Sequence, residues 1–448
     1  MRSLYLFRRD LRLEDNTGLL AALAESDEVV VLFITTPEQV GKNEYKSEKA
    51  LSFMIDSLEE LEEALKTRGG KLHYAHGEPA RIVETLIKEK GIEAIHCNHD
   101  YTPYAVARDE RIRDICKKHE VPFKAHHDYL LNEPRKTVKD DGNPYTVFTP
   151  YYRKAMRYEV AKPRKNEHTN YATIRHETLK STHRLKVKER SWRGGRKAGL
   201  QALKEAEGKK GYEHQRDYPA IEGTTRLSPH HKFGTLSIRE SYWALRKSHG
   251  ATSDLIRQLY WRDFFTQVAY HHPHVFGGNF NRKYDKVEWD KDEEKFKKWC
   301  SGTTGFPIVD AGMRELASTG WMHNRVRMIT ASFLTKHLHL DWRLGEKWFA
   351  QKLVDYDPCV NNGSWQWAAS TGCDAQPWFR VFNPWRQQER FDPEAEYIKR
   401  WVPELKELTA KDIHSLAEKP TKGYPEPMVE HKAERAEALR RFQSAKRT

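Results

Sequence analysis

The stretch Val29-Val30-Val31-Leu32-Phe33-Ile34 is a run of apolar, mostly β-branched residues, and a segment with helical spacing follows it. Apolar residues recur at that helical spacing at Leu51, Met54, Ile55, Leu58, Leu61 and Leu65. Further short apolar runs occur at Leu4–Phe7, Lys71–Tyr74, Glu93–Cys97 and Phe123–His126. Alternation of strands and helices predicts an α/β domain over residues 1–130, with a doubly wound parallel sheet. No G-x-G-x-x-G follows the first run, so a classical dinucleotide site is not predicted.

The rest of the chain has a different composition. Residues 131–195 are polar, basic and rich in proline, and they predict a long connecting linker over the surface. Residues 196–448 predict an all-helical second domain, because few β-like runs occur there and all 13 tryptophans lie from Trp192 onward. The expected helices cover Asp254–Val268, Pro307–Ser318, Val326–His337, Glu346–Val354 and Val429–Arg447.

Composition narrows the class of protein. The 77 Lys and Arg residues against 64 Asp and Glu residues give a net charge of +13, which favours a polyanionic partner but also occurs in merely basic proteins. The five cysteines form no C-x-x-C pair, so neither a zinc site nor a disulfide framework is predicted. No apolar stretch approaches the roughly 20 residues of a membrane span, and no signal peptide is evident. We expect a cytoplasmic monomer without a metal site.

Two segments in the second half suggest an anion site and an aromatic contact. In Gly223-Thr224-Thr225-Arg226-Leu227-Ser228-Pro229, hydroxyls before a helical stretch suit a phosphate at a helix N-terminus, or an ordinary N-cap. In Gln258-Leu259-Tyr260-Trp261-Arg262-Asp263, the indole could stack on a base while the arginine contacts a phosphate. A tryptophan in the helical core is the alternative.

Two later segments combine charges, amides and tryptophans. In Trp321-Met322-His323-Asn324-Arg325-Val326-Arg327-Met328, the two arginines diverge by about 200° on a helix, so one could face DNA and the other a cofactor. A solvated basic helix start is the alternative. The other segment runs from Asp355-Tyr356-Asp357 through Asn361 to Trp365 and Trp367. Its acids and amides match the hydrogen-bonding groups on the uracil-like edge of a flavin. A capped helix start with structural tryptophans is the alternative.

In this order and spacing, the four segments resemble the photolyase/cryptochrome family over essentially the whole chain, from Phe7-Arg8-Arg9-Asp10 to Phe391-Asp392-Pro393. The Trp321–Met328 segment is most similar to class I photolyases that act on cyclobutane pyrimidine dimers, whereas (6-4) enzymes carry a His in place of Asn324. The resemblance implies a lyase that uses FAD and light to repair UV-damaged DNA. A cryptochrome-like blue-light sensor, a (6-4) photolyase and a non-enzymatic nucleic-acid-binding flavoprotein are the alternatives.

The resemblance also assigns residues. It implies FAD binding by Tyr212, Thr224, Thr225, Arg226, Leu227, Ser228, Arg327, Asp355, Tyr356, Asp357 and Asn361. It implies DNA contacts from Arg216, Gln258, Trp261, Arg262, Asn324, Arg325, Met328 and Trp367. Electron transfer to the flavin would run through Trp289, Trp342 and Trp365. Catalytic roles fall to Asn361, beside the flavin N5, and to Gln258, which stands where class I enzymes usually place Glu. We therefore expect repair at a reduced quantum yield.

The expected antenna chromophore is of the hydroxy-deazaflavin type. The Glu that binds methenyltetrahydrofolate in related enzymes aligns with Ala105, and its neighbour with Tyr104, which disfavours folate. The segment from Asn98 to Asp109 is closer to the deazaflavin-binding type, with Asp100, Arg108 and Lys232 as the implied contacts. Thr102 replaces an acid of that type, so a flavin antenna or an empty pocket stays open.

Overall fold

The computed structural model describes residues 1–41, 43–180, 182–183, 185–188 and 190–447. The chain forms two compact units, each built from separated segments. The first unit comprises Met1–Gly208, Thr225–Pro273 and Val354–Tyr356. The second unit comprises Lys209–Thr224, His274–Leu353 and the chain from Asp357 onward.

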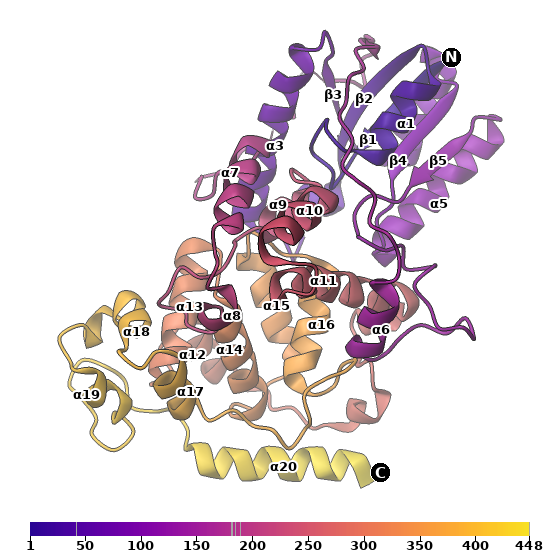
Figure 1. Cartoon of the computed structure of the whole chain (residues 1–448). Helices are drawn as coiled ribbons and strands as arrows, with labels where there is room; N and C mark the ends of the chain where they lie inside the picture. Colours follow the sequence, from indigo (N-terminus) through magenta and orange to yellow (C-terminus); the bar gives the residue numbers. More distant parts are fainter. Residues whose placement is uncertain (42, 181, 184, 189, 448) are drawn as a thin grey trace. The chain divides into compact units, whose positions relative to one another are not determined.

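The first unit contains the expected parallel sheet, and the doubly wound prediction is confirmed (Figure 1). Its strands lie in the order β3-β2-β1-β4-β5, and all neighbours pair in parallel. They are β1 (Arg2–Phe7), β2 (Glu28–Thr35), β3 (Leu72–His76), β4 (Ala94–Asn98) and β5 (Phe123–His126). Each begins or ends within two residues of the apolar run that predicted it.

Helices cover both faces of this sheet because neighbouring strand residues point to opposite sides. Tyr5 and Phe7 of β1 pack in one apolar cluster, whereas Leu4 and Leu6 pack in the other. The first cluster includes residues of α1 (Thr17–Glu25) and α3 (Glu48–Lys66), and the second includes residues of α4 (Pro79–Lys90) and α5 (Pro103–Lys118). A short helix, α2 (Pro37–Val40), follows β2.

Residues 131–195, predicted as a linker, contain a helix and a short strand. The helix is α6 (Phe148–Ala155), and the strand β6 (Tyr171–Ala172) pairs in parallel with the start of β2. Phe148, Tyr151 and Ala155 are buried, so α6 has one apolar face. Its proline, Pro150, lies in the first helical turn, where an N–H has no partner within the helix. Pro150 argued against a helix in the sequence, but at this position it is compatible with one.

Four helices from the region predicted as helical also belong to the first unit. They are α7 (Arg196–Glu207), α9 (Ser228–Phe233), α10 (Ile238–His249) and α11 (Asp254–His271). The boundaries expected from the sequence at residues 130 and 195 stay a prediction.

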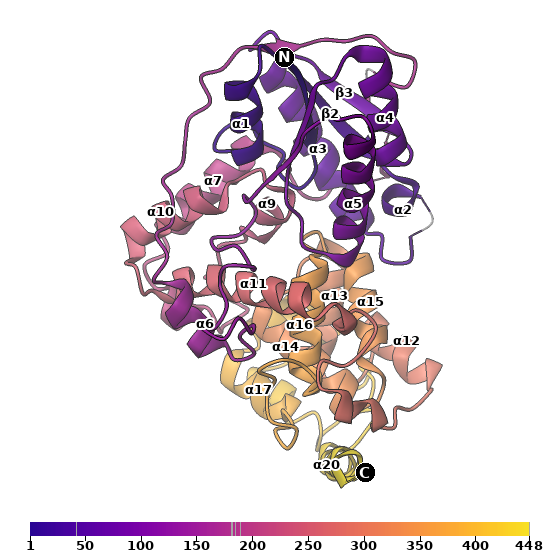
Figure 2. The same cartoon turned by 90° about the vertical axis from the view of Figure 1, so that its right-hand side faces the viewer.

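The described residues of the second unit form helices and connecting loops and no β-strand, as expected of a helical domain (Figure 2). It contains α8 (Tyr212–Gln215), α12 (Glu293–Ser301), α13 (Pro307–Thr319), α14 (Asn324–Lys336), α15 (Trp342–Lys352), α16 (Pro358–Ala369), α17 (Pro384–Phe391), α18 (Glu396–Trp401), α19 (Ala410–His414) and α20 (His431–Arg447). The expected start of α15 at Glu346 was wrong by four residues. The helix begins where Asp341 caps it, since the Asp341 side chain accepts from the Arg343 N–H.

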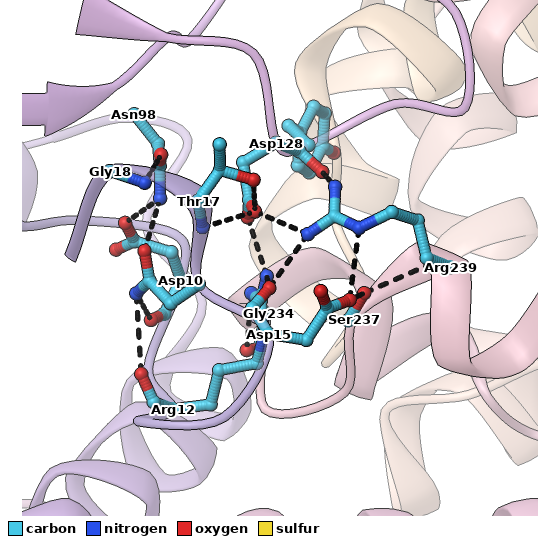
Figure 3. A network of polar contacts seen from close by, with 12 residues as sticks. Asp10, Arg12, Asp15, Thr17, Gly18, Asn98, Asp128, Gly234, Ser237 and Arg239 are labelled. Carbon is cyan, nitrogen blue, oxygen red and sulfur yellow. Dashed lines mark hydrogen bonds and ion pairs between the residues drawn. The ribbon is translucent and has the colours of Figure 1, made fainter. Parts of the chain in front are cut away.

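A buried network of ion pairs joins the sheet of the first unit to α10 (Figure 3). Asp128, just after β5, accepts from Arg12 at 2.6 Å and from Arg239 of α10 at 2.7 Å. Arg239 also pairs with Asp15 at 2.9 Å, and Arg12 donates to the Gly234 carbonyl at 3.1 Å.

The side chains of this network are almost completely withdrawn from water. Those of Arg12, Asp15 and Asp128 are each 2% exposed. Burial alone would raise the pKa of Asp128, but Arg12 and Arg239 outweigh it and hold that pKa well below its ordinary value. The carboxylate therefore stabilises the fold above its unfolded pKa of about 4, and this contribution is lost as the pH falls below that value.

Replacing Asp128 with Asn should lower the free energy of unfolding by about 3–5 kcal/mol at pH 7, because it leaves two buried guanidiniums without their shared anion. Chemical denaturation measures the change. Asp140→Asn is the matched control, since the Asp140 side chain is 98% exposed in its pair with Lys154. A loss below about 1 kcal/mol for Asp128→Asn would contradict the role given to this network.

Candidate functional site

The loop before α9 has the backbone shape of an anion site within the first unit. Arg226 has a left-handed conformation with φ 51°, and Leu227 follows in the right-handed helical region with φ −77°. Adjacent residues in these two conformations turn successive N–H groups toward one side, which suits a phosphate. The N-cap position of α9 is Leu227, without a side-chain hydrogen bond, so the ordinary N-cap alternative was wrong.

Ser228 and Tyr356 carry the side-chain chemistry of this part of the first unit. Ser228 Oγ donates to Asp355 Oδ2 at 2.6 Å, which links two of the residues assigned to the flavin. Tyr356 stacks against Tyr45 with ring centroids 6.3 Å apart, and Lys232 Nζ lies 5.9 Å from the Tyr356 ring centroid. These contacts place Asp355 and Tyr356 together with the α9 loop.

In the second unit, α16 positions Asp357 and Asn361. Asp357 is the N-cap of α16 and accepts from the Cys359 and Val360 N–H groups at 3.0 and 3.2 Å. Asn361 Nδ2 donates to the Glu346 carbonyl at 3.1 Å and to Glu346 Oε1 at 3.0 Å. Because both partners are acceptors, they fix which end of the amide carries the nitrogen. Asn361 therefore offers its Oδ1 as an acceptor, which fits the N–H that a reduced flavin carries at N5.

The three tryptophans assigned to electron transfer differ in burial, and all lie in the second unit. Trp365 and Trp342 are 2% and 1% exposed, whereas Trp289 is half-buried. Trp342 Nε1 donates to Asn279 Oδ1 at 2.8 Å. A Cβ on Gly345 would lie only 2.1 Å from the Trp365 ring, so glycine is needed where α15 passes this indole.

A fourth tryptophan was missed from the sequence. Trp299 of α12 meets Trp365 edge to face, with ring centroids 6.1 Å apart. Trp299 is fully buried, and its Nε1 donates to the Thr330 carbonyl at 3.1 Å. The sequence carries no local signal for this pair, because the two residues are 66 positions apart.

Trp261 of α11 is half-buried and pairs with a ring from the linker. Phe148 of α6 lies face to face with it, with ring centroids 3.6 Å apart and an interplanar angle of 5°. Gln258, one turn earlier on α11, is also half-buried. One face of the indole is thus covered within the first unit.

Arg262 is oriented toward the protein interior. Its side chain is 13% exposed, and it donates to the Tyr129 carbonyl at 2.8 Å and to the His231 carbonyl at 3.3 Å. The guanidinium also lies over the Tyr129 ring, 3.8 Å from its centroid. The hydrogen-bonding groups of Arg262 are therefore largely engaged within the first unit.

The two arginines of α14 point to different partners, as their spacing predicted. Arg325 Nη2 donates to Asp217 Oδ1 at 2.7 Å and lies over the Phe391 ring at 4.3 Å. Arg327 Nε donates instead to the Met322 carbonyl at 2.7 Å.

Other residues assigned to DNA lie in the same unit. Asn324 Nδ2 contacts Met328 Sδ at 3.7 Å, Arg216 lies over the Tyr212 ring at 5.8 Å, and Trp367 is half-buried.

The antenna residues belong to the first unit but have different surroundings. Asp100 pairs with Arg9 at 3.4 Å and lines an open hollow of about 440 Å³ near the carboxyl end of β4. Arg108 is buried and pairs with Asp109 at 3.0 Å. Lys232 lies beside Tyr356. The Thr102 side chain accepts from the Ala105 N–H as the N-cap of α5.

Two negative findings apply to the described residues. In that part of the chain, no group of three or more His, Cys, Asp or Glu side chains is arranged to hold a metal ion. Nor does any described helix combine the length and apolar character needed to cross a membrane.

Comparison with known proteins places the chain in a family. A family model described as DNA photolyase matches residues 3–168, and one described as the FAD binding domain of DNA photolyase matches residues 255–444. The chain is 38% identical to a deoxyribodipyrimidine photo-lyase of Halobacterium salinarum, over 99% of each chain.

Comparison with solved structures leads to the same family. An archaeal photolyase from Sulfolobus tokodaii, solved with two FAD molecules, has a TM-score of 0.88 and 43% identity, over 99% of this chain and 100% of its own. A class III photolyase from Agrobacterium tumefaciens has a TM-score of 0.91 and 35% identity, over 100% and 98% of the two chains. The chain belongs to the DNA photolyase family, and the resemblance seen in the sequence is confirmed.

Asp263, next to Arg262, makes the stability of the first unit depend on pH. It is fully buried, with Oδ2 accepting from the Asn132 N–H at 3.1 Å and Oδ1 3.9 Å from Arg262 Nη1. Burial raises the pKa of Asp263 to about 7 against the opposing charge of Arg262. The folded pKa of Asp263 therefore exceeds its unfolded value of about 4. For such a carboxyl, the free energy of unfolding falls as the pH rises from the unfolded to the folded pKa, here from about 4 to about 7.

Asp263→Asn should remove this pH dependence, because an amide keeps the acceptor for Asn132 without the charge. The free energy of unfolding of the variant minus that of wild type should increase by at least about 1 kcal/mol when the pH is raised from 5 to 8. Urea denaturation at several pH values measures the difference. An unchanged difference across that range would show that Asp263 ionises with an ordinary pKa.

Proposed function

We propose that this chain is a deoxyribodipyrimidine photo-lyase that repairs cyclobutane pyrimidine dimers in DNA with light and FAD. The match to relatives of that name over nearly the whole of both chains carries the proposal. That match covers 99% of this chain, so it includes the segments that hold the candidate flavin and DNA residues. Asn324, where (6-4) enzymes have a His, favours the cyclobutane dimer as the lesion. The monomeric state and cytoplasmic location expected from the sequence stay predictions.

The residues present fit FAD. In the first unit, the Thr225–Ser228 loop would hold phosphate oxygens through its N–H groups, with Asp355 and Tyr356 beside it. In the second unit, Asn361 would accept from the flavin edge, since Glu346 occupies its Nδ2. Tyr212, Thr224, Arg327 and Asp357 complete the proposed set. When bound and fully reduced, FAD supplies the excited-state electron that opens the cyclobutane ring, and it regains that electron afterwards.

The protein binds and orients the lesion. Photolyases are among the enzymes that extrude their target bases from the duplex, and a damaged pair is poorly stacked, which lowers the cost of extrusion. We propose that Trp261 and Trp367 stack on the dimer, while Gln258, Asn324 and Arg325 hydrogen-bond it. Arg216 and Met328 of the second unit are also proposed to contact the DNA. Arg262 donates to two main-chain carbonyls of the first unit, and it would hold in place the helix that carries Gln258 and Trp261.

Trp365, Trp342 and Trp289 are proposed to return electrons to an oxidised flavin. Trp365 and Trp342 are buried and Trp289 is half-buried, which is the order expected of a path from the interior to the surface. Indole is easily oxidised, and the hydrogen bond from Trp342 to Asn279 holds one ring in place.

We also propose an antenna chromophore with a flat tricyclic ring. Its proposed contacts are Asp100, Arg108 and Lys232, and Asp100 lines the open hollow near the carboxyl end of β4. Hydroxy-deazaflavin is favoured by the sequence over methenyltetrahydrofolate. A second flavin is the other candidate, since the Sulfolobus tokodaii photolyase was solved with two FAD molecules.

Purified protein with chemically reduced FAD should convert dimer-containing DNA to undamaged bases under near-ultraviolet or blue light, and should do nothing in the dark. Gln258→Glu should raise the repair quantum yield, because a carboxyl can share a proton with the dimer radical anion and an amide cannot do so readily. Chromatography of the digested DNA measures repair. Wild-type protein that binds reduced FAD but repairs no dimers in light would refute the repair function and favour a light sensor.

The antenna prediction is checked on protein purified from its native cells. Heat denaturation should release one FAD plus one deazaflavin, or two flavins, per chain, and chromatography with absorption spectra identifies them. A release of folate, or of one FAD alone, would contradict the tricyclic antenna.

A further inference from the structure

Helix α6, in the segment predicted as a linker, carries a ring that stacks on Trp261, one of the residues proposed to contact DNA. Phe148, the first residue of α6, is 1% exposed and lies parallel to Trp261 at 3.6 Å. Behind it, Tyr152 continues the stack, with ring centroids 5.6 Å apart and an angle of 13°. Three rings are thus layered in the order Trp261, Phe148, Tyr152.

The stack is held from the side by further contacts. The Arg257 guanidinium lies 5.4 Å from the Phe148 centroid and 5.7 Å from the Tyr152 centroid. Phe264 meets both Phe148 and Trp261 edge to face, at 5.7 Å from each. These contacts fix the plane of Phe148, and a face-to-face partner at 3.6 Å in turn fixes the plane of the Trp261 indole.

This arrangement limits where a base can stack on Trp261. Phe148 covers one face of the indole, and Phe265 lies against the ring at 5.6 Å with a tilt of 32°. Trp261 is nevertheless only half-buried, so part of the indole is accessible to a base. We propose that Phe148 is a positioning residue for lesion recognition, which holds the Trp261 indole in one plane with one face toward the flipped dimer. The proposal rests on the proposed repair function and deepens it, since it makes α6 of the linker part of substrate selection.

The stack acts on the damaged base and not on the phosphates. Affinity for undamaged DNA comes mostly from phosphate contacts, which set the salt dependence of binding. Loss of Phe148 should therefore weaken discrimination for the dimer and leave both the affinity for undamaged DNA and the salt dependence unchanged. A role in folding alone would not change the ratio of the two affinities.

The test compares binding, in the dark, to duplexes with and without a single cyclobutane dimer. Phe148→Leu keeps an apolar side chain but removes the flat ring, and it should lower the ratio of affinities roughly three- to tenfold, equivalent to about 0.6–1.4 kcal/mol. Phe148→Tyr keeps a ring that can stack and should restore the wild-type ratio. If Phe148→Leu does not yield folded, FAD-loaded protein, Phe148→Met carries the same prediction.

Tyr151→Leu is the matched control, because it removes a buried ring from the same helix α6 that packs against Phe264 and Tyr145. It should lower the melting temperature but change the ratio of affinities by less than about twofold. A wild-type ratio in Phe148→Leu, or an equal loss in Tyr151→Leu, would overturn the proposal while wild-type repair still supported the proposed function. Wild-type protein that neither prefers nor repairs dimer-containing DNA would instead refute both.

Discussion

The first unit depends on two buried arginines that share one carboxylate. Arg12 and Arg239 both donate to Asp128, which is almost wholly shielded from water. Charges withdrawn from water are costly unless each is paired, so the loop after β1, the end of β5 and the start of α10 must stay together. This requirement attaches the end of α9 and the start of α10 to the sheet. Helix α9, which begins at Ser228, is thus held at its end, and α11, which carries Trp261, packs against α10.

Much of the fold could be predicted from local patterns. The run at Val29–Ile34 and its counterparts predicted the sheet, because a strand buried on both faces is apolar at every position. Helix α6 escaped prediction, since its buried positions lie among prolines and polar residues. The ion pairs of Asp128 could not be predicted either. They join positions 12, 128 and 239, and nothing local marks one Asp as the partner of two distant arginines.

The site shows the same division between local and distant information. The motifs around Asn361 and Trp261 could be recognised from the order of residues, and the family assignment confirmed the resemblance. What the sequence did not contain is the partner of each side chain. Glu346 orients Asn361, Phe148 covers one face of Trp261, and Asp217 engages Arg325. Each partner lies at least 15 positions away, where only the folded chain brings the two residues together.

The central claim is that light absorbed by a bound reduced flavin drives repair in this chain. An action spectrum of dimer repair tests it most directly. The rate of repair per incident photon, measured against wavelength, should follow the absorption of fully reduced FAD, with an added band wherever a bound antenna absorbs. Repair that proceeds equally in the dark, or a spectrum that follows neither chromophore, would contradict the account.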